Sequence, residues 1–204
     1  MTAMTFDPLF EIAYVRPGKE KSTLTVGVRG EDGVRAFTVT ESLYRRIASP
    51  RTGDRIDEDT LLLLREEDER REAMKIALRL LAFADNSERA LTDKLRQRGI
   101  PRVRAEETVR ETVRLGYLDE ERALRTLILS AANHKLHGPA RIRAALAAKG
   151  YPQAKISRIL RALSEEGEID FEESFARLLA EKAGDSPSSE EIQKYRIQYG
   201  YRSC

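Results

Sequence analysis

The sequence has no tryptophan, and Phe, Trp and Tyr together make up only 6% of its 204 residues. Its single cysteine, Cys204, excludes a disulfide bond within the chain. No apolar run approaches the roughly 20 residues that cross a bilayer, which argues against an integral membrane protein. The N-terminal segment carries neither a basic stretch nor a long apolar one, so a secretory signal is not expected. These absences predict a cytoplasmic protein.

Motifs of the common enzyme classes are also missing. The sequence contains no GxxxxGK[ST] loop, no GxSxG, no HExxH and no pairing of Cys with His. His134 and His137 lie three residues apart and could share a metal, but no cysteine or carboxylate stands near them in the sequence. We therefore expect a protein that is not an enzyme and that holds no metal and no cofactor.

What the sequence does contain changes after about forty residues. Apolar and polar residues alternate over three early segments, near 10–16, 22–29 and 34–40. An alternation of this kind is typical of half-buried strands, and glycines between the segments supply turns. The sequence therefore predicts three short antiparallel strands at the N-terminal end.

Helical patterns follow the strands. Thr40 can cap a helix over 41–48, and Asp57 can cap a second helix. The charged stretch 65–72 is compatible either with a linker or with a continuous helix, and the sequence leaves both open. From residue 73 onward, apolar residues recur at the spacing of amphipathic helices.

An internal repeat organises the rest of the chain. The segment SERALTDKLRQRGIP over 87–101 aligns with GPARIRAALAAKGYP over 138–152, an offset of 51 residues. The same offset carries GYLD over 116–119 onto GEID over 167–170. Because one small helical unit buries little alone, tandem three-helix units of about 50 residues should stack on one another. A third copy begins near residue 172 and has no room for a third helix, so it is truncated or serves as a cap.

The predicted fold is mainly α, with tandem three-helix repeats forming an elongated curved stack after a small N-terminal antiparallel β-containing extension. We expect the extension over 1–70, the first repeat over 71–118, the second repeat over 119–164, and a partial third repeat over 165–204.

The near-neutral net charge of +2 is a cancellation. Residues 1–70 carry −3 and residues 164–204 carry −5, whereas residues 71–118 carry +4 and residues 119–163 carry +6. The 43 residues between Glu121 and Glu165 contain no acidic residue at all. This distribution predicts a basic face for a polyanion, either nucleic acid or an acidic protein groove. The alternative is a solvated surface whose charge a neighbouring repeat balances. The candidate partner-binding residues are Lys135, Arg141, Arg143, Lys149, Arg158 and Arg161.

The repeats resemble those of the RecX family of recombination regulators. The second-repeat signature is matched by Gly138-Pro139, Arg141, Ile142, Arg143, Leu146, Lys149 and Gly150. The opening pattern of the first repeat is matched by Ser87, Glu88, Leu91, Lys94, Leu95 and Gly99. The family's junction is matched by Gly116-Tyr117-Leu118-Asp119. Two features depart from the family: residues 131–136 are less basic than expected, and the third repeat ends early.

The resemblance implies a regulatory protein of recombination, DNA repair and the SOS response. Such a protein binds the RecA recombinase filament in its groove, near the bound single strand. It limits filament growth and suppresses ATP hydrolysis and strand exchange. We expect it to act as a monomer, with single-stranded DNA as a further partner. The alternative is a stand-alone helical module that binds single-stranded nucleic acid, because short helices separated by tight turns also describe helix-turn-helix domains.

Overall fold

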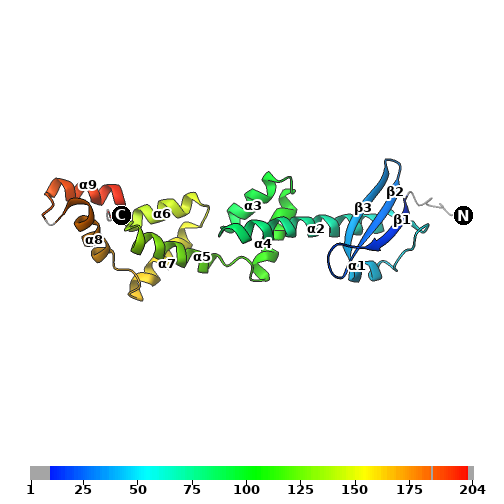
Figure 1. Cartoon of the computed structure of the whole chain (residues 1–204), viewed down its shortest axis with the longest axis horizontal. Helices are drawn as coiled ribbons and strands as arrows, with labels where there is room; N and C mark the ends of the chain where they lie inside the picture. The colour runs from blue at the N-terminus through cyan, green and yellow to red at the C-terminus, as the bar shows by residue number, and fades with distance from the viewer. Residues whose placement is uncertain (1–9, 185, 202–204) are drawn as a thin grey trace, which may run out of the picture. The chain divides into compact units, whose positions relative to one another are not determined.

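The computed structural model describes residues 10–184 and 186–201 (Figure 1). It divides into two compact units, Met1–Ile76 and Ala77–Cys204. Most of the described residues are helical, and a small antiparallel sheet lies in the N-terminal unit, which confirms the predicted fold class. Cys204 lies outside the described residues. Within these residues, no helix combines the length and the apolar character needed to cross a membrane.

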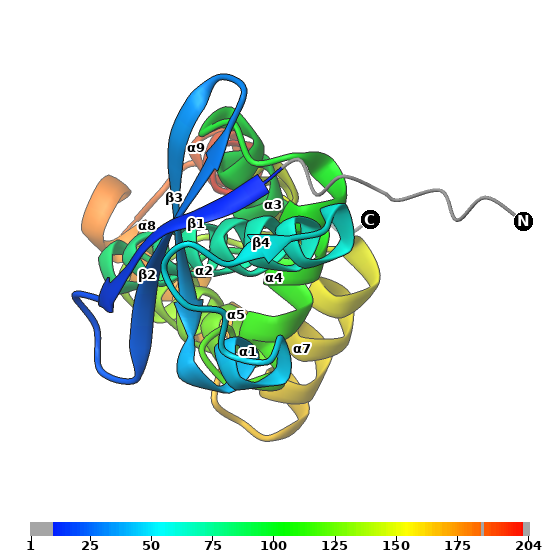
Figure 2. The same ribbon diagram turned by 90° about the vertical axis from the view of Figure 1, so that its right-hand side faces the viewer.

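The described part of the N-terminal unit contains a four-stranded antiparallel sheet in the order β3-β2-β1-β4 (Figure 2). Its strands are β1 (Phe10–Pro17), β2 (Thr23–Gly30), β3 (Gly33–Thr40) and β4 (Arg55–Ile56). The three long strands confirm the prediction from alternating residues. β4 was not predicted, because two residues are too few to show an alternating period.

Helices α1 (Glu41–Arg46) and α2 (Glu58–Phe83) follow in the chain, and their caps are those that the sequence indicates. Oγ1 of Thr40 accepts the N–H of Leu43 at 3.2 Å, and Oδ1 of Asp57 accepts the N–H of Thr60 at 2.8 Å. α2 runs without a break through the charged stretch 65–72, which settles the question left open by the sequence. Charges pair along this stretch, as for Arg70 with Glu67 at 3.0 Å, and such pairs support the helix where it has no apolar stripe.

The C-terminal unit is helical, and we divide its helices into three groups by sequence order. The first helical group comprises α3 (Glu88–Gln97) and α4 (Arg102–Arg114). The second comprises α5 (Glu120–Leu129), the π-helical turn η1 (Ser130–His134), α6 (Pro139–Ala148) and α7 (Gln153–Glu165). The third comprises α8 (Phe171–Ala183) and α9 (Ser189–Tyr199).

The helices repeat at the offset found in the sequence. α3 and α6 begin and end 51 residues apart, and so do α4 and α7. Glycines close the equivalent helices α3, α6 and α9 in left-handed backbone, with φ of 84° at Gly99, 88° at Gly150 and 82° at Gly200. The structure therefore confirms the tandem repeat that the two matching blocks predict.

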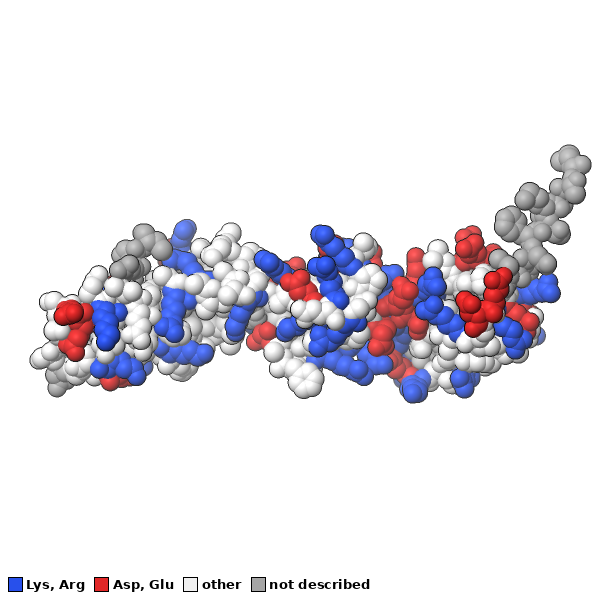
Figure 3. Space-filling view, turned by 90° about the horizontal axis from the view of Figure 1, so that it is seen from above, with Lys and Arg blue, Asp and Glu red and all other residues white. Residues whose placement is uncertain are grey.

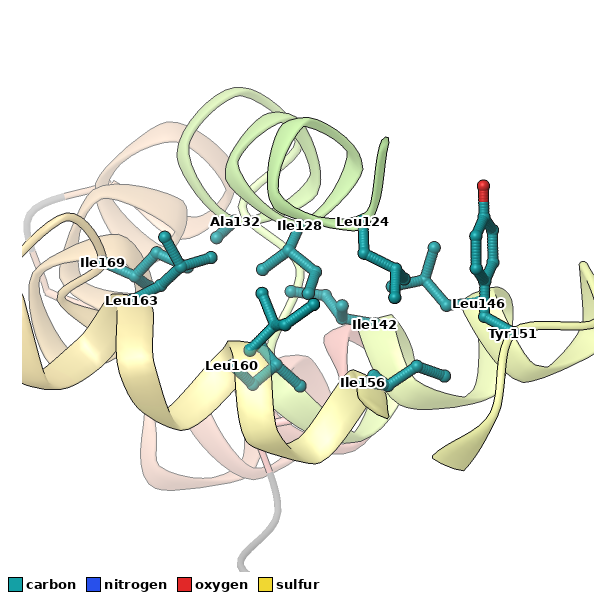
Figure 4. Close-up of a cluster of buried hydrophobic side chains, with 11 residues drawn as sticks. Leu124, Ile128, Ala132, Ile142, Leu146, Tyr151, Ile156, Leu160, Leu163 and Ile169 are labelled. Atoms are coloured by element: carbon teal, nitrogen blue, oxygen red, sulfur yellow. The ribbon is translucent and has the colours of Figure 1, made fainter. Parts of the chain in front are cut away.

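The second helical group has its own apolar core (Figure 4). Leu124 and Ile128 of α5 point toward Leu160 and Leu163 of α7, and Ile142 of α6 lies between them. All five side chains are buried. The apolar stripes predicted for these helices therefore meet in one cluster, which fixes the directions of their polar faces.

The third helical group packs on the end of the second through aromatic side chains. Phe175 and Leu178 of α8 are buried with Leu136, and Tyr195, Tyr199 and Tyr201 pack against them. The Tyr201 hydroxyl donates a hydrogen bond to the carbonyl oxygen of Leu136 at 3.0 Å. These tyrosines therefore pack against the other helices of the C-terminal unit.

Candidate partner-binding surface

The six predicted partner-binding residues all lie in or beside the second helical group. Lys135 follows η1, Lys149 ends α6, and the others lie on α6 and α7, at Arg141, Arg143, Arg158 and Arg161. On the face seen in Figure 3, the region of α6 shows several Lys and Arg side chains and few Asp or Glu. The contacts of these residues differ, and they divide the set into two kinds.

Arg141 is directed at the third helical group. Its guanidinium donates to the carbonyl oxygen of Gln198 at 2.8 Å and lies 5.5 Å from the centre of the Tyr199 ring. Both contacts hold the C-terminal end of α9 against the N-terminal end of α6. Arg141 therefore has a structural role within the chain, which sequence spacing alone did not indicate. Arg143 is half-buried and also has an interaction partner.

Arg158 is paired with an acidic residue from the edge of the acid-free stretch. Its guanidinium lies 2.6 Å from the carboxylate of Glu121, and both side chains are more than half exposed. An exposed pair of this kind contributes little to stability, at most about 1 kcal/mol. It does, however, neutralise charge at this position of the surface.

Two further ion pairs bring acidic residues to the basic stretch. Arg125 of α5 contacts Glu166 at 2.5 Å and Glu168 at 2.8 Å. Lys155 of α7 pairs with Glu120, whose side chain is only 5% exposed. The stretch that lacks acidic residues in the sequence is therefore partly balanced in space by residues just outside it. The alternative of a balanced surface holds for these positions.

Lys135, Lys149 and Arg161 remain as exposed cations. In residues 10–184 and 186–201, no ion-pair partner lies near any of the three, and the same holds for Arg122 of α5. Cations without a neighbouring acid retain their full attraction for an anionic partner. Arg122 lies at the start of the acid-free stretch but was not among the predicted contact residues.

The first helical group shows the opposite pattern. On α4, Arg102 pairs with Glu106 at 2.8 Å, Arg104 with Glu107 at 2.7 Å, and Arg114 with Glu111 at 2.6 Å. The hydrogen bond from Arg102 lowers the pKa of the Glu106 carboxyl from its ordinary value. Net positive charge is therefore highest over the second helical group, since residues 119–163 carry +6.

The histidines show no arrangement that would bind a metal. His137 packs near the Tyr199 ring, with 6.3 Å between the ring centres. Burial, together with the charges of Arg141 and Lys135, lowers the pKa of His137. Among the described residues, no group of three or more His, Cys, Asp or Glu side chains could hold a metal ion.

The fold and this surface define a helical repeat protein with a basic second repeat. A family model described as RecX, first three-helix domain, matches residues 73–112. The chain is 33% identical over 129 residues to the regulatory protein RecX of Pseudomonas entomophila (strain L48), covering 61% of this chain and 80% of that protein. It is 37% identical over 87 residues to the regulatory protein RecX of Pseudomonas syringae pv. tomato (strain ATCC BAA-871 / DC3000), covering 43% and 56% of the two chains. The chain belongs to the RecX family of regulatory proteins.

A solved structure shares the fold. The crystal structure of a regulatory protein RecX superposes with a TM-score of 0.68 and 20% sequence identity, over 95% of this chain and 93% of that chain. The similarity therefore includes the N-terminal sheet as well as the helices.

Proposed function

We propose that this protein binds the RecA recombinase filament in its groove and inhibits the ATPase activity, strand exchange and filament growth of RecA. The second helical group supplies the contact surface, through Lys135, Lys149 and Arg161. Membership of the RecX family supports the choice of partner. The observation that carries the proposal is the net charge of +6 over residues 119–163 of a chain whose net charge is only +2, with Lys135, Lys149 and Arg161 exposed in that segment.

The mechanism is competitive and needs no catalytic residue from this chain. Several cations on one rigid group can contact acidic residues of the groove, or DNA phosphates, at the same time. Contacts that form together raise the overall affinity well above that of each contact alone. A helical array seated in the groove would block the next RecA subunit and the incoming DNA strand by its bulk.

The test is RecA-dependent ATP hydrolysis on single-stranded DNA, titrated with the full-length protein. We expect inhibition at amounts of protein that are stoichiometric with RecA or lower. An unchanged hydrolysis rate throughout that range would overturn the proposal.

The alternative, a stand-alone module for single-stranded nucleic acid, is favoured by the same cations, because phosphates would also satisfy them. Its signature is binding to bare DNA whose log–log salt dependence has a slope near −0.7 per neutralised phosphate. Tight binding to bare single strands that RecA does not change would favour this alternative. Weak binding to bare strands, with strong binding to the filament, would favour the regulator.

We further propose that the protein acts as a monomer in the cytoplasm, in the context of recombination, DNA repair and the SOS response. A single copy is sufficient for the competitive mechanism, because one chain carries the whole cationic set. Sedimentation at the concentration that inhibits RecA would show a mass of one chain if this is correct.

A further inference from the structure

The joint between the first and second helical groups is polar. The Ser87 hydroxyl donates to the carbonyl oxygen of Lys149 at 2.9 Å, which links the start of α3 to the end of α6. The carboxylate of Glu120 accepts the backbone N–H of Glu88 at 3.0 Å. The ammonium group of Lys155 then pairs with Glu120 and lies 3.8 Å from the Glu88 carboxylate. Charge therefore holds this joint together.

Apolar packing does not extend across it in the same way. The buried cluster of the second helical group runs from Leu124 to Ile169 and includes no residue of α3 or α4. Tyr151 stands at the edge of this cluster, its hydroxyl directed away from the other side chains (Figure 4). That hydroxyl is buried and has no hydrogen-bond partner in the described part of the chain. A buried polar group without a partner is a weak point in packing.

The joint between the second and third helical groups has a different chemistry. Backbone groups bond directly there, with Gly138 N–H donating to the Tyr199 carbonyl oxygen at 2.7 Å and Ala140 N–H to that of Gly200 at 3.1 Å. Apolar side chains also pack across this joint, since Leu136, between η1 and α6, is buried with Phe175 and Leu178 of α8. Close backbone contact and apolar packing resist bending, because neither can shift without opening a gap.

The repeat explains this difference residue by residue. At the offset of 51, Glu88 corresponds to Pro139, and Glu120 corresponds to Phe171. Proline has no N–H to donate, and phenylalanine has no carboxylate to accept it. Donor and acceptor are thus both present at one joint and both absent at the other. The two joints therefore differ in chemistry at equivalent positions: the first is ionic, and the second is built from backbone hydrogen bonds and apolar side chains.

We propose that the first joint is an ion-pair hinge. The first and second helical groups change their relative angle about the contacts of Glu120 and Lys155, while the second and third groups move as one body. The inference rests on the fold alone and does not depend on the proposed function.

The test measures two distance distributions by spin-label spectroscopy in the full chain, with Cys204→Ser as background. Labels at Arg110→Cys and Ser164→Cys span the first joint, and labels at Ser164→Cys and Gln193→Cys span the second. All three labelled positions are exposed. We expect the distribution across the first joint to be the broader of the two. Equal widths, or a broader distribution across the second joint, would overturn the proposal.

Matched variants assign the effect to the buried carboxylate. Glu120→Gln removes the charge that Lys155 faces, and we expect the first distribution to widen further. Glu121→Gln removes the adjacent carboxylate, which pairs with Arg158 inside the second group, and should leave both distributions unchanged. If the Glu120→Gln variant loses its helical circular dichroism signal, the Lys155→Met variant is measured in its place. Lys155→Met breaks the same ion pair by removing its other partner. The folded variant, Glu120→Gln or Lys155→Met, should widen the distance distribution across the first joint and leave the one across the second joint unchanged. Any other result would contradict the hinge.

Discussion

Gly138 and Gly200 are in contact where the C-terminal end of α9 meets the N-terminal end of α6. A methyl group placed on Gly138 would lie 2.4 Å from the carbonyl oxygen of Gly200, and one on Gly200 would lie 2.5 Å from the backbone nitrogen of Arg141. α6 has no side-chain cap, and the carbonyl groups that end α9 accept its first N–H groups instead. One helix thus completes the hydrogen bonds of the other, and their dipoles are aligned head to tail.

The first prediction compares two glycines at equivalent positions. Gly99 and Gly200 both end a helix with φ above 80°, but no atom lies within 4 Å of a methyl group built on Gly99. Gly99→Ala should therefore carry only the backbone cost of about 1 kcal/mol. Gly200→Ala should cost about 1–3 kcal/mol more, because the added methyl group overpacks the contact with α6. Hydrogen exchange of the α9 amides measures the difference, and equal effects of both variants would contradict the described contact.

The second prediction concerns Arg141. Replacing it with alanine removes the hydrogen bond to Gln198 and the contact with the Tyr199 ring. A hydrogen bond from a charged group is worth about 1.5 kcal/mol or more, so amide exchange in α9 should become about tenfold faster. Arg161→Ala is the control, because Arg161 is exposed and no ion-pair partner lies near it among the described residues. Unchanged exchange in Arg141→Ala would mean that α9 is held without this side chain.

The third prediction tests the exposed cations. If the protein acts as proposed, the double variant Lys149→Glu and Arg161→Glu should weaken its inhibition of RecA. At about 0.5–1 kcal/mol for each exposed charge, the half-inhibitory concentration should rise about five- to thirtyfold. Arg102→Glu serves as the control, since Arg102 is equally exposed but already paired with Glu106 on α4. Equal loss in the control would show that total charge, rather than the second helical group, determines binding.

The fourth prediction contrasts the hydroxyl of Tyr151, which is buried, with that of Tyr201, which is partly buried. Tyr201→Phe loses the hydrogen bond to Leu136 and should destabilise the C-terminal unit by about 0.5–1.5 kcal/mol. Tyr151→Phe removes a buried hydroxyl that has no partner among the described residues, so it should be neutral or stabilising. Thermal unfolding of the two variants side by side gives the comparison. A larger loss in Tyr151→Phe would show that its hydroxyl has a partner, such as a buried water molecule.

The fifth prediction is the pH dependence of folding stability that arises from the phenol groups of Tyr151 and Tyr201. Burial raises the pKa of Tyr151 to about 12 and the pKa of Tyr201 to about 12. In the unfolded chain both phenols ionise near pH 10, so the unfolded state releases protons first. The contribution of these two phenols to the free energy of unfolding is therefore complete below about pH 10, and it is lost as the pH rises toward about 12. Absorbance of the phenolate ion, followed with the stability of wild type and of the two phenylalanine variants, checks this. Ionisation of both groups near pH 10 in the folded protein would be inconsistent with the burial described.

Much of the fold could be predicted because its elements carry strong local patterns. Ile156, Ile159, Leu160 and Leu163 lie at helical spacing, and all four are buried on α7. The early strands alternate with period two, and the predicted caps Thr40 and Asp57 each begin a helix. The repeat adds a second, independent constraint. The helical spacing, the alternation and the caps are each contained within about a dozen residues, whereas the repeat compares blocks 51 residues apart.

Features that depend on contacts between distant residues could not be predicted. Arg158 and Glu121 pair across 37 positions, and Arg141 reaches Gln198 across 57. No periodicity in the sequence indicates such a pair. The sequence therefore could not separate the exposed candidate cations from those that already bond within the chain. The continuity of α2 escaped prediction for a related reason, because charged residues from 65 to 72 show no apolar stripe.

The capping box at the start of α9 gives the row of equivalent helices two unlike ends. The start of α3 contacts the end of α6, and the start of α6 contacts the end of α9. The start of α9 is closed by its own side chains instead, with the Ser188 N–H donating to the Glu191 carboxylate at 2.9 Å and the Glu191 N–H to the Ser188 hydroxyl at 3.3 Å. The capping box thus supplies at α9 the hydrogen bonds that the end of a neighbouring helix supplies at α6, so the start of α9 is complete without a further helix against it.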